Sequence, residues 1–425
     1  MKRQFLLVFL AWLGACLFGA LPFYFSGYIP NFTDAVFEST SGFTTTGATV
    51  LVDIEALPKW LLFWRAITQW LGGMGIVLLV AALLPLFEAG SFHLVKADTH
   101  GMHKEKFVPR ISLAAKLLWL LYVSLTALQI LLLAFFGMSW FDAVTHAFST
   151  MSTGGFSVRN NSIAYYNSPG IEWVCIVFMF LAGFNFALIW QLLRGKLRCI
   201  MRRKPDAVIR NSEARAYTGI VLIAAIIITI AIFPKSPSFG TGEVHRALRQ
   251  AFFQVTSLIS TSGLYSADYS RWPSAALGIL FFLLFIGGCS GSTAGGIKVI
   301  RYVILSKQMW NEMKRVVYPK GIFSIQLNGK SGKKAAVHGV AGFVFLYFLI
   351  LFFTALLVST SGADVFSSIN TAVICQGNTG LGLGDPGVFK FFPDYVKWGL
   401  CLVMITGRLE LWAVLILFTG DFWRK

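Results

Sequence analysis

The sequence predicts an all-α membrane protein built from four similar units, and three observations support this fold class. First, 56% of the residues are apolar and only 13% are charged, which is about half the charged share of a soluble domain. Second, apolar runs close to the roughly 20 residues that cross a bilayer recur along the chain. Third, a short segment rich in Ser, Thr and Gly occurs four times between these runs.

The long apolar runs are predicted to be transmembrane helices, because a bilayer core offers no water to backbone groups. Clear examples are residues 117–136, 171–189, 217–233 and 340–358. The first run follows Lys2 and Arg3, as in a secretory signal peptide, and the residues around Cys16 resemble a lipoprotein cleavage box. Because this run continues past Cys16, we interpret it as the first membrane helix.

The net charge of +17 could suggest a nucleic-acid partner, but the placement of the charges argues against one. Basic residues are frequent at both chain ends and in residues 96–116, 194–215 and 301–334, whereas residues 26–59 and 158–172 are nearly free of them. This alternation is the positive-inside pattern. It predicts that both termini and the three basic segments, including Arg203 and Lys330, are cytoplasmic, and that Asn160 faces outside. Some of these cations can bind anionic lipid headgroups.

The cysteines and histidines give no sign of catalysis or of a transition-metal site. The six cysteines lack CxxC spacing, and the six histidines lack an HExxH motif. No organic cofactor and no catalytic residue are predicted on this chain, which we expect not to be an enzyme. An intramembrane enzyme is a remote alternative, although no paired Asp, Ser/His or zinc set lies in the apolar runs.

The four polar segments define an internal repeat. They are residues 39–48, 148–157, 256–264 and 375–382. Each has a Thr or Ser directly before a glycine, and these glycines follow one another at intervals of 107, 109 and 117 residues: Gly47, Gly154, Gly263 and Gly380. A near-constant period of this size indicates four copies of one membrane unit.

Each unit has the same predicted plan of helix, re-entrant half-helix, loop and second helix. The half-helices are residues 34–43, 142–151, 244–259 and 364–374, and three of them begin with Asp, which favours a helix N-terminus. Irregular backbone at membrane depth has to be buried or line a cavity. We therefore expect eight transmembrane helices and four half-helices around a single pore. The predicted repeats are residues 1–90, 110–205, 211–318 and 333–425.

The four loops carry the chemistry of a monovalent-cation site. Glycine lets carbonyls turn toward a common axis, and a ring of carbonyls can replace an ion's hydration shell. The loops lack a carboxylate for a divalent ion, and the hydroxyls of Thr46, Thr153, Ser262 and Thr379 are expected to add ligands. The predicted ion-binding residues are Thr45, Thr46, Gly47, Thr153, Gly154, Thr261, Ser262, Gly263, Asn378, Thr379 and Gly380. Alternatively, these small residues only mark close helix packing.

A second glycine-rich stretch, residues 287–296, interrupts an apolar run in the third repeat. It is not a phosphate-binding loop, since Ile297 separates its last glycine from Lys298, and it predicts a broken second helix. Arg408 lies inside the last apolar run, where a charge is costly and usually functional. The alternatives are a kink without a role, and an ion pair between Arg408 and Glu410 or another repeat.

Several motifs extend over the chain: SGFTTTGAT (41–49), QWLGGMGI (69–76), TGGFS (153–157), FFQV (252–255), GGCSGSTAGGIKVIR (287–301), KRVVYP (314–319) and GRLE (407–410). Together they resemble the Trk/Ktr/HKT superfamily of potassium transporters, and within it the TrkH branch. The resemblance implies K⁺ as the transported ion, a homodimer, and a multi-pass location in a bacterial inner membrane. It also implies a cytosolic nucleotide-binding regulatory subunit, for which the three basic segments are the expected docking surface.

The resemblance further implies that dehydrated K⁺ passes the four loops as a selectivity filter, with a gate beneath them. The implied gate residues are Gly287, Gly288, Ser290, Gly291, Ser292, Thr293, Gly295, Gly296 and Arg408. The chain departs from the branch in three ways. The branch usually carries two further N-terminal helices, Leu264 follows the third glycine where an aromatic is common, and the fourth loop reads TGLG where LGPG is favoured. A Na⁺-permeable or Na⁺/H⁺-coupled relative is the alternative function.

Overall fold

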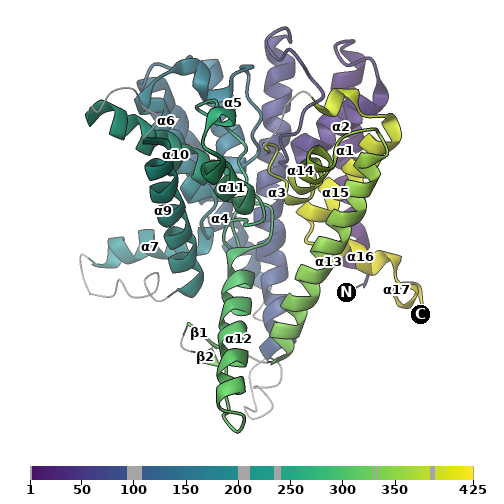
Figure 1. Ribbon diagram of the computed structural model, residues 1–425. Helices are drawn as coiled ribbons and strands as arrows, with labels where there is room; N and C mark the ends of the chain where they lie inside the picture. The colour runs from purple at the N-terminus through teal and green to yellow at the C-terminus, as the bar shows by residue number, and fades with distance from the viewer. Residues whose placement is uncertain are drawn as a thin grey trace.

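The computed structural model describes residues 2–92, 108–199, 211–233, 241–328, 330–331, 334–382 and 388–424. These residues form a mostly helical molecule (Figure 1). Within them, strands are limited to an antiparallel pair of two residues each, β1 (Gln326–Leu327) and β2 (Lys330–Ser331). The predicted predominance of helix is therefore confirmed.

The first two predicted repeats contain a long helix, a short helix and a second helix in the same order. The first comprises α1 (Lys2–Phe25), α2 (Phe32–Phe43) and α3 (Lys59–Phe92). The second comprises α4 (Val108–Phe135), α5 (Trp140–Ser152), the 3₁₀ helix η3 (Ser162–Tyr166), α6 (Pro169–Ala182) and α7 (Phe186–Cys199).

The last two predicted repeats follow the same order. The third comprises α9 (Ser212–Ile232), α10 (Thr241–Ile259), η5 (Tyr269–Arg271), α11 (Ser274–Leu283) and α12 (Val299–Val317). The fourth comprises α13 (Lys334–Ser359), α14 (Val365–Gly377), η6 (Val388–Phe391), α15 (Asp394–Arg408), α16 (Trp412–Leu415), η7 (Ile416–Phe418) and α17 (Gly420–Trp423). The short helices α2, α5, α10 and α14 correspond to the predicted half-helices. Residues 93–107 and 200–210, where two repeat boundaries and Arg203 fall, lie outside the described residues.

Side-chain caps explain where three of the half-helices begin. Asn31 accepts a hydrogen bond from the amide of Thr33 at the start of α2. Ser139 and Asp364 bind the amides of residues 142 and 367 in the same way, at the starts of α5 and α14. Each cap binds an amide that has no partner within the helix. The polar residues that the sequence places before these short segments therefore fix their N-termini.

Packing between successive repeats arranges the half-helices in a circle. The half-helix α5 packs against α3 of the preceding repeat, and α10 packs against α6. The half-helix α2 of the first repeat packs against α15 of the last, which closes the circle. The two ends of the chain thus meet, although their residues are more than 350 positions apart in sequence.

Four helices within the described ranges are long and apolar enough to cross a membrane without a break, namely α1, α4, α9 and α13. Two further spans are possible if bent pairs count as one: α6 with α7, bent by 104°, and α15 with α16 and η7, bent by 114°. The expected number of eight transmembrane helices therefore stays a prediction.

The structure adds two bends that the sequence did not predict. The second helices of the second and fourth repeats also bend sharply. Asn185 starts a new helix at the first bend, because its side chain accepts hydrogen bonds from the amides of Ala187 and Leu188. At the second bend Glu410 has a left-handed backbone, with φ at 57°. Neither bend contains the Gly/Pro cluster that would signal a break.

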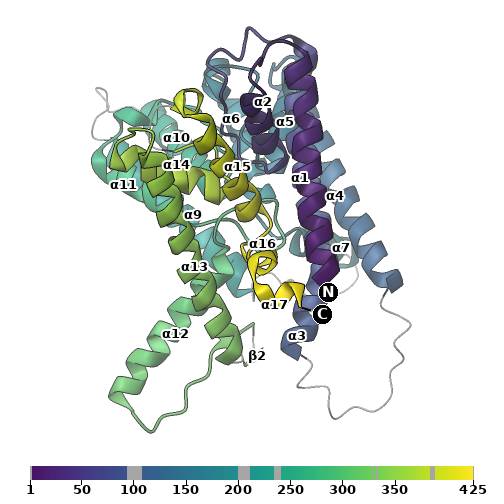
Figure 2. The same cartoon turned by 90° about the vertical axis from the view of Figure 1, so that its right-hand side faces the viewer.

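The two termini lie on the same side of the molecule as the free end of α12 and the strand pair (Figures 1 and 2). Figure 2 shows that α12 extends away from the helical body on this side. This arrangement agrees with the predicted common sidedness of the chain ends and the basic segment around α12. Which side faces the cytoplasm stays a prediction.

Candidate functional site

All four half-helices end with the same backbone turn. The first or second residue after each helix end has a left-handed conformation with φ between 52° and 57°, and none of the four is glycine: Thr45, Thr153, Thr261 and Asn378. The amide of the following residue then binds the carbonyl five positions earlier, as in Thr46 to Ser41 at 2.8 Å and Thr379 to Ile374 at 3.1 Å. This closure is a Schellman turn. Non-glycine residues in this conformation are strained and cluster at functional sites.

Glycines with positive φ follow these turns and form a closed ring between the loops. They are Gly47, Gly155, Gly263 and Gly380, with φ between 70° and 87°. A Cβ atom added to any of them would lie 2.1 to 2.4 Å from a carbonyl oxygen of the next loop, in the order Gly154, Ser262, Thr379 and Thr46. Such distances exclude a side chain. Glycine is therefore required at each position by both the conformation and the close approach of the neighbouring loop.

The structure corrects the register predicted for the second loop. Gly155, not Gly154, has the place of Gly47, since Thr153 is the left-handed residue and Gly155 contacts the third loop. The intervals between equivalent glycines become 108, 108 and 117 residues. Two adjacent glycines left the sequence alignment ambiguous by one position, and only the backbone conformation resolves it.

The structure also corrects the predicted set of equivalent hydroxyls. Thr46 Oγ1 already binds Thr44 Oγ1 at 2.7 Å and Asn378 Nδ2 at 2.9 Å, while Ser262 Oγ binds Ser260 Oγ at 2.8 Å. The structurally equivalent side chains are instead those of the left-handed residues. Among the described residues, Thr45 Oγ1, Thr379 Oγ1 and Asn378 Oδ1 have no hydrogen-bond partner although they are fully buried. They leave oxygen acceptors beside the ring.

The electrostatics of the ring favour a cation. The C-terminal ends of α2, α5, α10 and α14 all meet the ring, and the C-terminus of a helix carries a partial negative charge. The ring itself contributes carbonyl oxygens and no carboxylate. A site of neutral oxygens with weak negative dipoles suits a monovalent ion better than a divalent one, which usually takes carboxylates.

The glycine-rich stretch is irregular, as predicted. It lies between the end of α11 at Leu283 and the start of α12 at Val299. Its two arms approach each other, since Gly287 donates to the carbonyl of Ile297 at 2.9 Å and a Cβ on Gly287 would lie 2.1 Å from the Gly295 carbonyl. The predicted break in this helix is confirmed.

The glycine-rich stretch lies directly against the ends of three half-helices. Thr153 Oγ1 donates to the carbonyl of Thr293 at 2.9 Å, and Thr293 Oγ1 contacts the Met151 carbonyl at 3.1 Å. The amide of Gly295 donates to Thr261 Oγ1 at 2.7 Å, and a Cβ on Gly295 would lie 2.3 Å from the carbonyl of Gly377. Two left-handed residues of the ring thus bind the stretch, a link that sequence reasoning missed.

Arg408 binds the same stretch, at the carbonyl that Thr153 also binds. Its Nη1 donates to the Thr293 carbonyl at 2.7 Å, and its Nη2 lies 3.3 Å from the Gly72 carbonyl. The guanidinium is 3% exposed, so it is removed from solvent. The predicted proximity of Arg408 to the stretch is confirmed. The alternative pairing with Glu410 is wrong, because Glu410 pairs with Arg301 at 2.5 Å.

Two further charges at the stretch were missed. Glu213 at the start of α9 accepts hydrogen bonds from the amides of Ser290 at 2.6 Å and Ile300 at 3.3 Å. Lys298, which precedes α12, is buried and donates from Nζ to the Ala294 carbonyl. An acidic residue directly before a long apolar run was the signal that could have drawn attention to Glu213.

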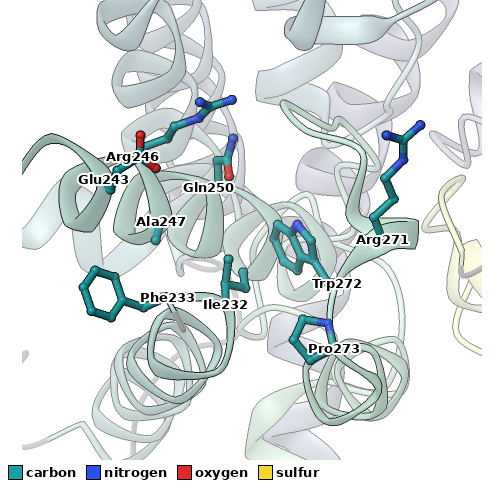
Figure 3. A pocket seen from close by; sticks show the side chains of 9 residues that line it. All are labelled: Ile232, Phe233, Glu243, Arg246, Ala247, Gln250, Arg271, Trp272 and Pro273. Atoms are coloured by element: carbon teal, nitrogen blue, oxygen red, sulfur yellow. The ribbon is translucent and has the colours of Figure 1, made fainter. Parts of the chain in front are cut away.

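A cavity of about 210 Å³ lies elsewhere, where the end of α9 meets α10 and the loop before α11 (Figure 3). Its lining includes Arg246, Trp272 and Pro273 and none of the ring residues. It does not belong to the candidate site.

The full chain, residues 1–425, matches the TrkH family, described as cation transport proteins. The chain belongs to this family. It is 40% identical over 428 residues to the Trk system potassium uptake protein TrkH of Salmonella typhimurium and to that of Escherichia coli K12, covering 100% of this chain and 86% of each relative. The Trk system potassium uptake protein TrkI of Halomonas elongata is 34% identical over 429 residues, covering 100% of this chain and 84% of that protein.

A solved structure agrees with this assignment. The chain is similar to the crystal structure of the potassium transporter TrkH from Vibrio parahaemolyticus, with a TM-score of 0.88 and 35% sequence identity. The match covers 100% of this chain and 86% of that one. Membership of the TrkH family makes this chain a membrane transport protein and not an enzyme, as the sequence predicted.

Proposed function

We propose that this chain is the K⁺-conducting membrane subunit of a Trk-type uptake system, and that its four loops form the selectivity filter. The observation that carries the proposal is the closed ring in which each loop glycine lies against a carbonyl of the next loop. The names of its relatives, all potassium uptake proteins, supply the identity of the ion. A dehydrated K⁺ ion would exchange its water shell for these carbonyl oxygens.

The glycine-rich stretch is proposed as the gate beneath this filter. Thr153, Thr261 and Arg408 bind it at Thr293 and Gly295, within the same few residues. In the closed state the stretch lies across the inner end of the ring, and the buried guanidinium repels a cation at low dielectric. Opening requires these hydrogen bonds to break, after which the two ring hydroxyls become free for the ion.

The proposed partners follow from the side of the molecule on which α12 extends. This helix carries Lys314 and Arg315 in its last turn, and it exposes Trp310 and Val316 near them. We propose that a cytosolic nucleotide-binding subunit docks on the basic segments and displaces the stretch by moving α12. A homodimer in a bacterial inner membrane, with both termini in the cytoplasm, completes the proposed assembly.

Ion flux into liposomes tests the proposed function. The purified chain is reconstituted in K⁺-loaded vesicles, and uptake of ⁸⁶Rb⁺ is measured against graded external Na⁺ and at several pH values. Rb⁺ uptake that Na⁺ does not inhibit is the expected result. Uptake that depends on a Na⁺ or proton gradient would favour the coupled alternative, and vesicles that take up no more Rb⁺ than protein-free ones would refute conduction.

A further inference from the structure

At one equivalent position, each of the four half-helices carries a different polar side chain. Nine residues before each ring glycine, the half-helix carries a buried polar residue: Glu38, His146, Gln254 and Thr371. All four are at most 4% exposed. The repeat therefore preserves a polar position behind each loop but not its chemistry.

The first two of these side chains hold their loops at equivalent atoms. Both carboxylate oxygens of Glu38 accept from Thr49 Oγ1 at 3.0 Å, and Oε2 also accepts from the Val50 amide at 3.1 Å. In the second repeat, His146 Nε2 lies 2.9 Å from Ser157 Oγ. Thr49 and Ser157 each come two residues after their ring glycine. The outer end of both loops is thus tied to its own half-helix.

The third loop differs from these two. Gln254 Nε2 has no hydrogen-bond partner in the part of the chain that the structure describes. The hydrogen bonds that connect each half-helix to its own loop therefore differ in strength. The strongest are those of the first loop, because their acceptor is the carboxylate of Glu38.

Arg65 of α3 connects Glu38 of the first repeat to the second loop. Its Nε donates to Glu38 Oε1 at 2.6 Å, and its Nη1 donates to the Ser157 carbonyl at 3.0 Å. The guanidinium carbon lies 3.7 Å from the centre of the Phe156 ring. Arg65 is 2% exposed and Glu38 is fully buried. One guanidinium therefore fixes the half-helix of the first repeat and the backbone of the second loop relative to each other.

We propose that the Glu38–Arg65 ion pair is a specificity-determining element of the filter, which sets the spacing of the first and second loops. This inference rests on the proposed function. A carbonyl ring that can contract coordinates the smaller Na⁺ ion as well as K⁺, so discrimination requires the loops to be held apart. Arg65 and Glu38 do not touch the ion in this account. They are positioning residues that act through Thr49, Val50 and Ser157.

The chain contains a matched control for this pair. Glu172 of α6 and Arg249 of α10 form a second buried ion pair at 2.8 Å, with side chains 5% and 10% exposed. Its hydrogen bond joins α10 to the preceding repeat and involves no residue of the ring loops. Removing either pair deletes two buried charges together, which avoids leaving one charge uncompensated. The Glu38–Arg65 pair contacts the ring loops, whereas the Glu172–Arg249 pair connects two helices and does not.

The test compares Glu38→Gln/Arg65→Met with Glu172→Gln/Arg249→Met in liposomes. The readout is the ratio of K⁺ to Na⁺ permeability, with the concentration dependence of Rb⁺ uptake separated into half-saturation and maximal rate. The first double variant is expected to lose about tenfold in the permeability ratio, the scale of one charge-assisted hydrogen bond. The control pair is expected to change the amount of assembled protein and not the ratio.

Two milder variants keep the proposal testable if the first double variant does not assemble. Thr49→Val removes the hydroxyl that donates to Glu38 and accepts from the Leu51 amide, and Arg65→Lys keeps the charge but loses the fork that reaches both Glu38 and Ser157. Each is expected to lower the permeability ratio by a smaller factor. Unchanged ratios in the assembled variants, or equal losses for both pairs, would overturn the assignment. A parent chain that carries no K⁺ would instead refute the proposed function, and the two failures are thereby distinguished.

Discussion

The four ring loops and the glycine-rich stretch have similar compositions, but their backbones are held in different ways. Each loop is closed by bonds to its own half-helix, such as Thr46 to Ser41. The glycine-rich stretch also accepts hydrogen bonds from other repeats, through Thr153 and Asn185 of the second and Arg408 of the fourth. Locally closed turns are fixed by the segment itself, whereas bonds between repeats break when one repeat moves. This difference supports the proposal that the stretch moves as the gate while the loops stay fixed.

The largest expected effect comes from filling the ring. Gly47→Ser puts a side chain 2.2 Å from the Gly154 carbonyl and strains a backbone with φ at 87°, so the neighbouring loop has to shift. We expect the K⁺/Na⁺ permeability ratio to fall by at least about tenfold, because in the proposed filter the ring geometry sets the selectivity. Gly278→Ala in α11 is the control, since the added Cβ would meet no described atom within 4 Å apart from its own helix backbone and chain neighbours. Unchanged selectivity in Gly47→Ser would contradict the fixed ring.

Loss of the buried cation is expected to release the stretch. Arg408→Ala removes the donor to Thr293 and the positive charge beside it. A hydrogen bond from a charged group contributes about 1.5 to 3 kcal/mol, so basal Rb⁺ flux should rise about 10- to 100-fold with selectivity retained. Shortening the glycine-rich stretch should act in the same direction. If both variants fold and assemble but conduct no faster than the parent, the stretch is only a kink.

A smaller effect is expected from the hydroxyls that join the ring to the stretch. Thr261→Val removes the acceptor for the Gly295 amide. A neutral hydrogen bond contributes about 0.5 to 1.5 kcal/mol, so basal flux should rise about threefold to tenfold. Thr354→Val is the matched control, because that hydroxyl bonds to Ile350 within its own helix. Equal flux in the two variants would show that the ring does not hold the stretch.

The smallest effect is expected at the surface. Arg271 and Asp268 form an ion pair at 3.0 Å, but their side chains are 87% and 57% exposed. Water and salt screen such a pair. Arg271→Ala should therefore leave Rb⁺ flux, selectivity and thermal stability within experimental error. A marked change in selectivity would indicate that surface charge, and not the buried network, controls the filter.

The sequence by itself determined the membrane class, the four polar segments with their glycines, and the glycine-rich stretch at residues 287–296. These features depend on local composition, as with Asp364 before α14 or the stretch before Lys298, and on the regular spacing of the four segments along the chain. The three Asp residues named from the sequence lie at helix N-termini, Asp364 as the N-cap and Asp34 and Asp142 in the first turn, because a helix start depends only on its own segment.

Only the tertiary structure decided which residues meet across repeats. The choice of Gly155 over Gly154, the bends at Asn185 and Glu410, and the contacts of Arg65 with Glu38 and Ser157 all depend on atoms far apart in sequence. Glycine is required where a carbonyl of a neighbouring loop comes too close for a side chain, and a buried charge is stabilised by a partner on another helix. The local sequence pattern does not predict either contact, because the carbonyl and the charged partner come from other repeats and lie nearby only after the four repeats have packed into a circle.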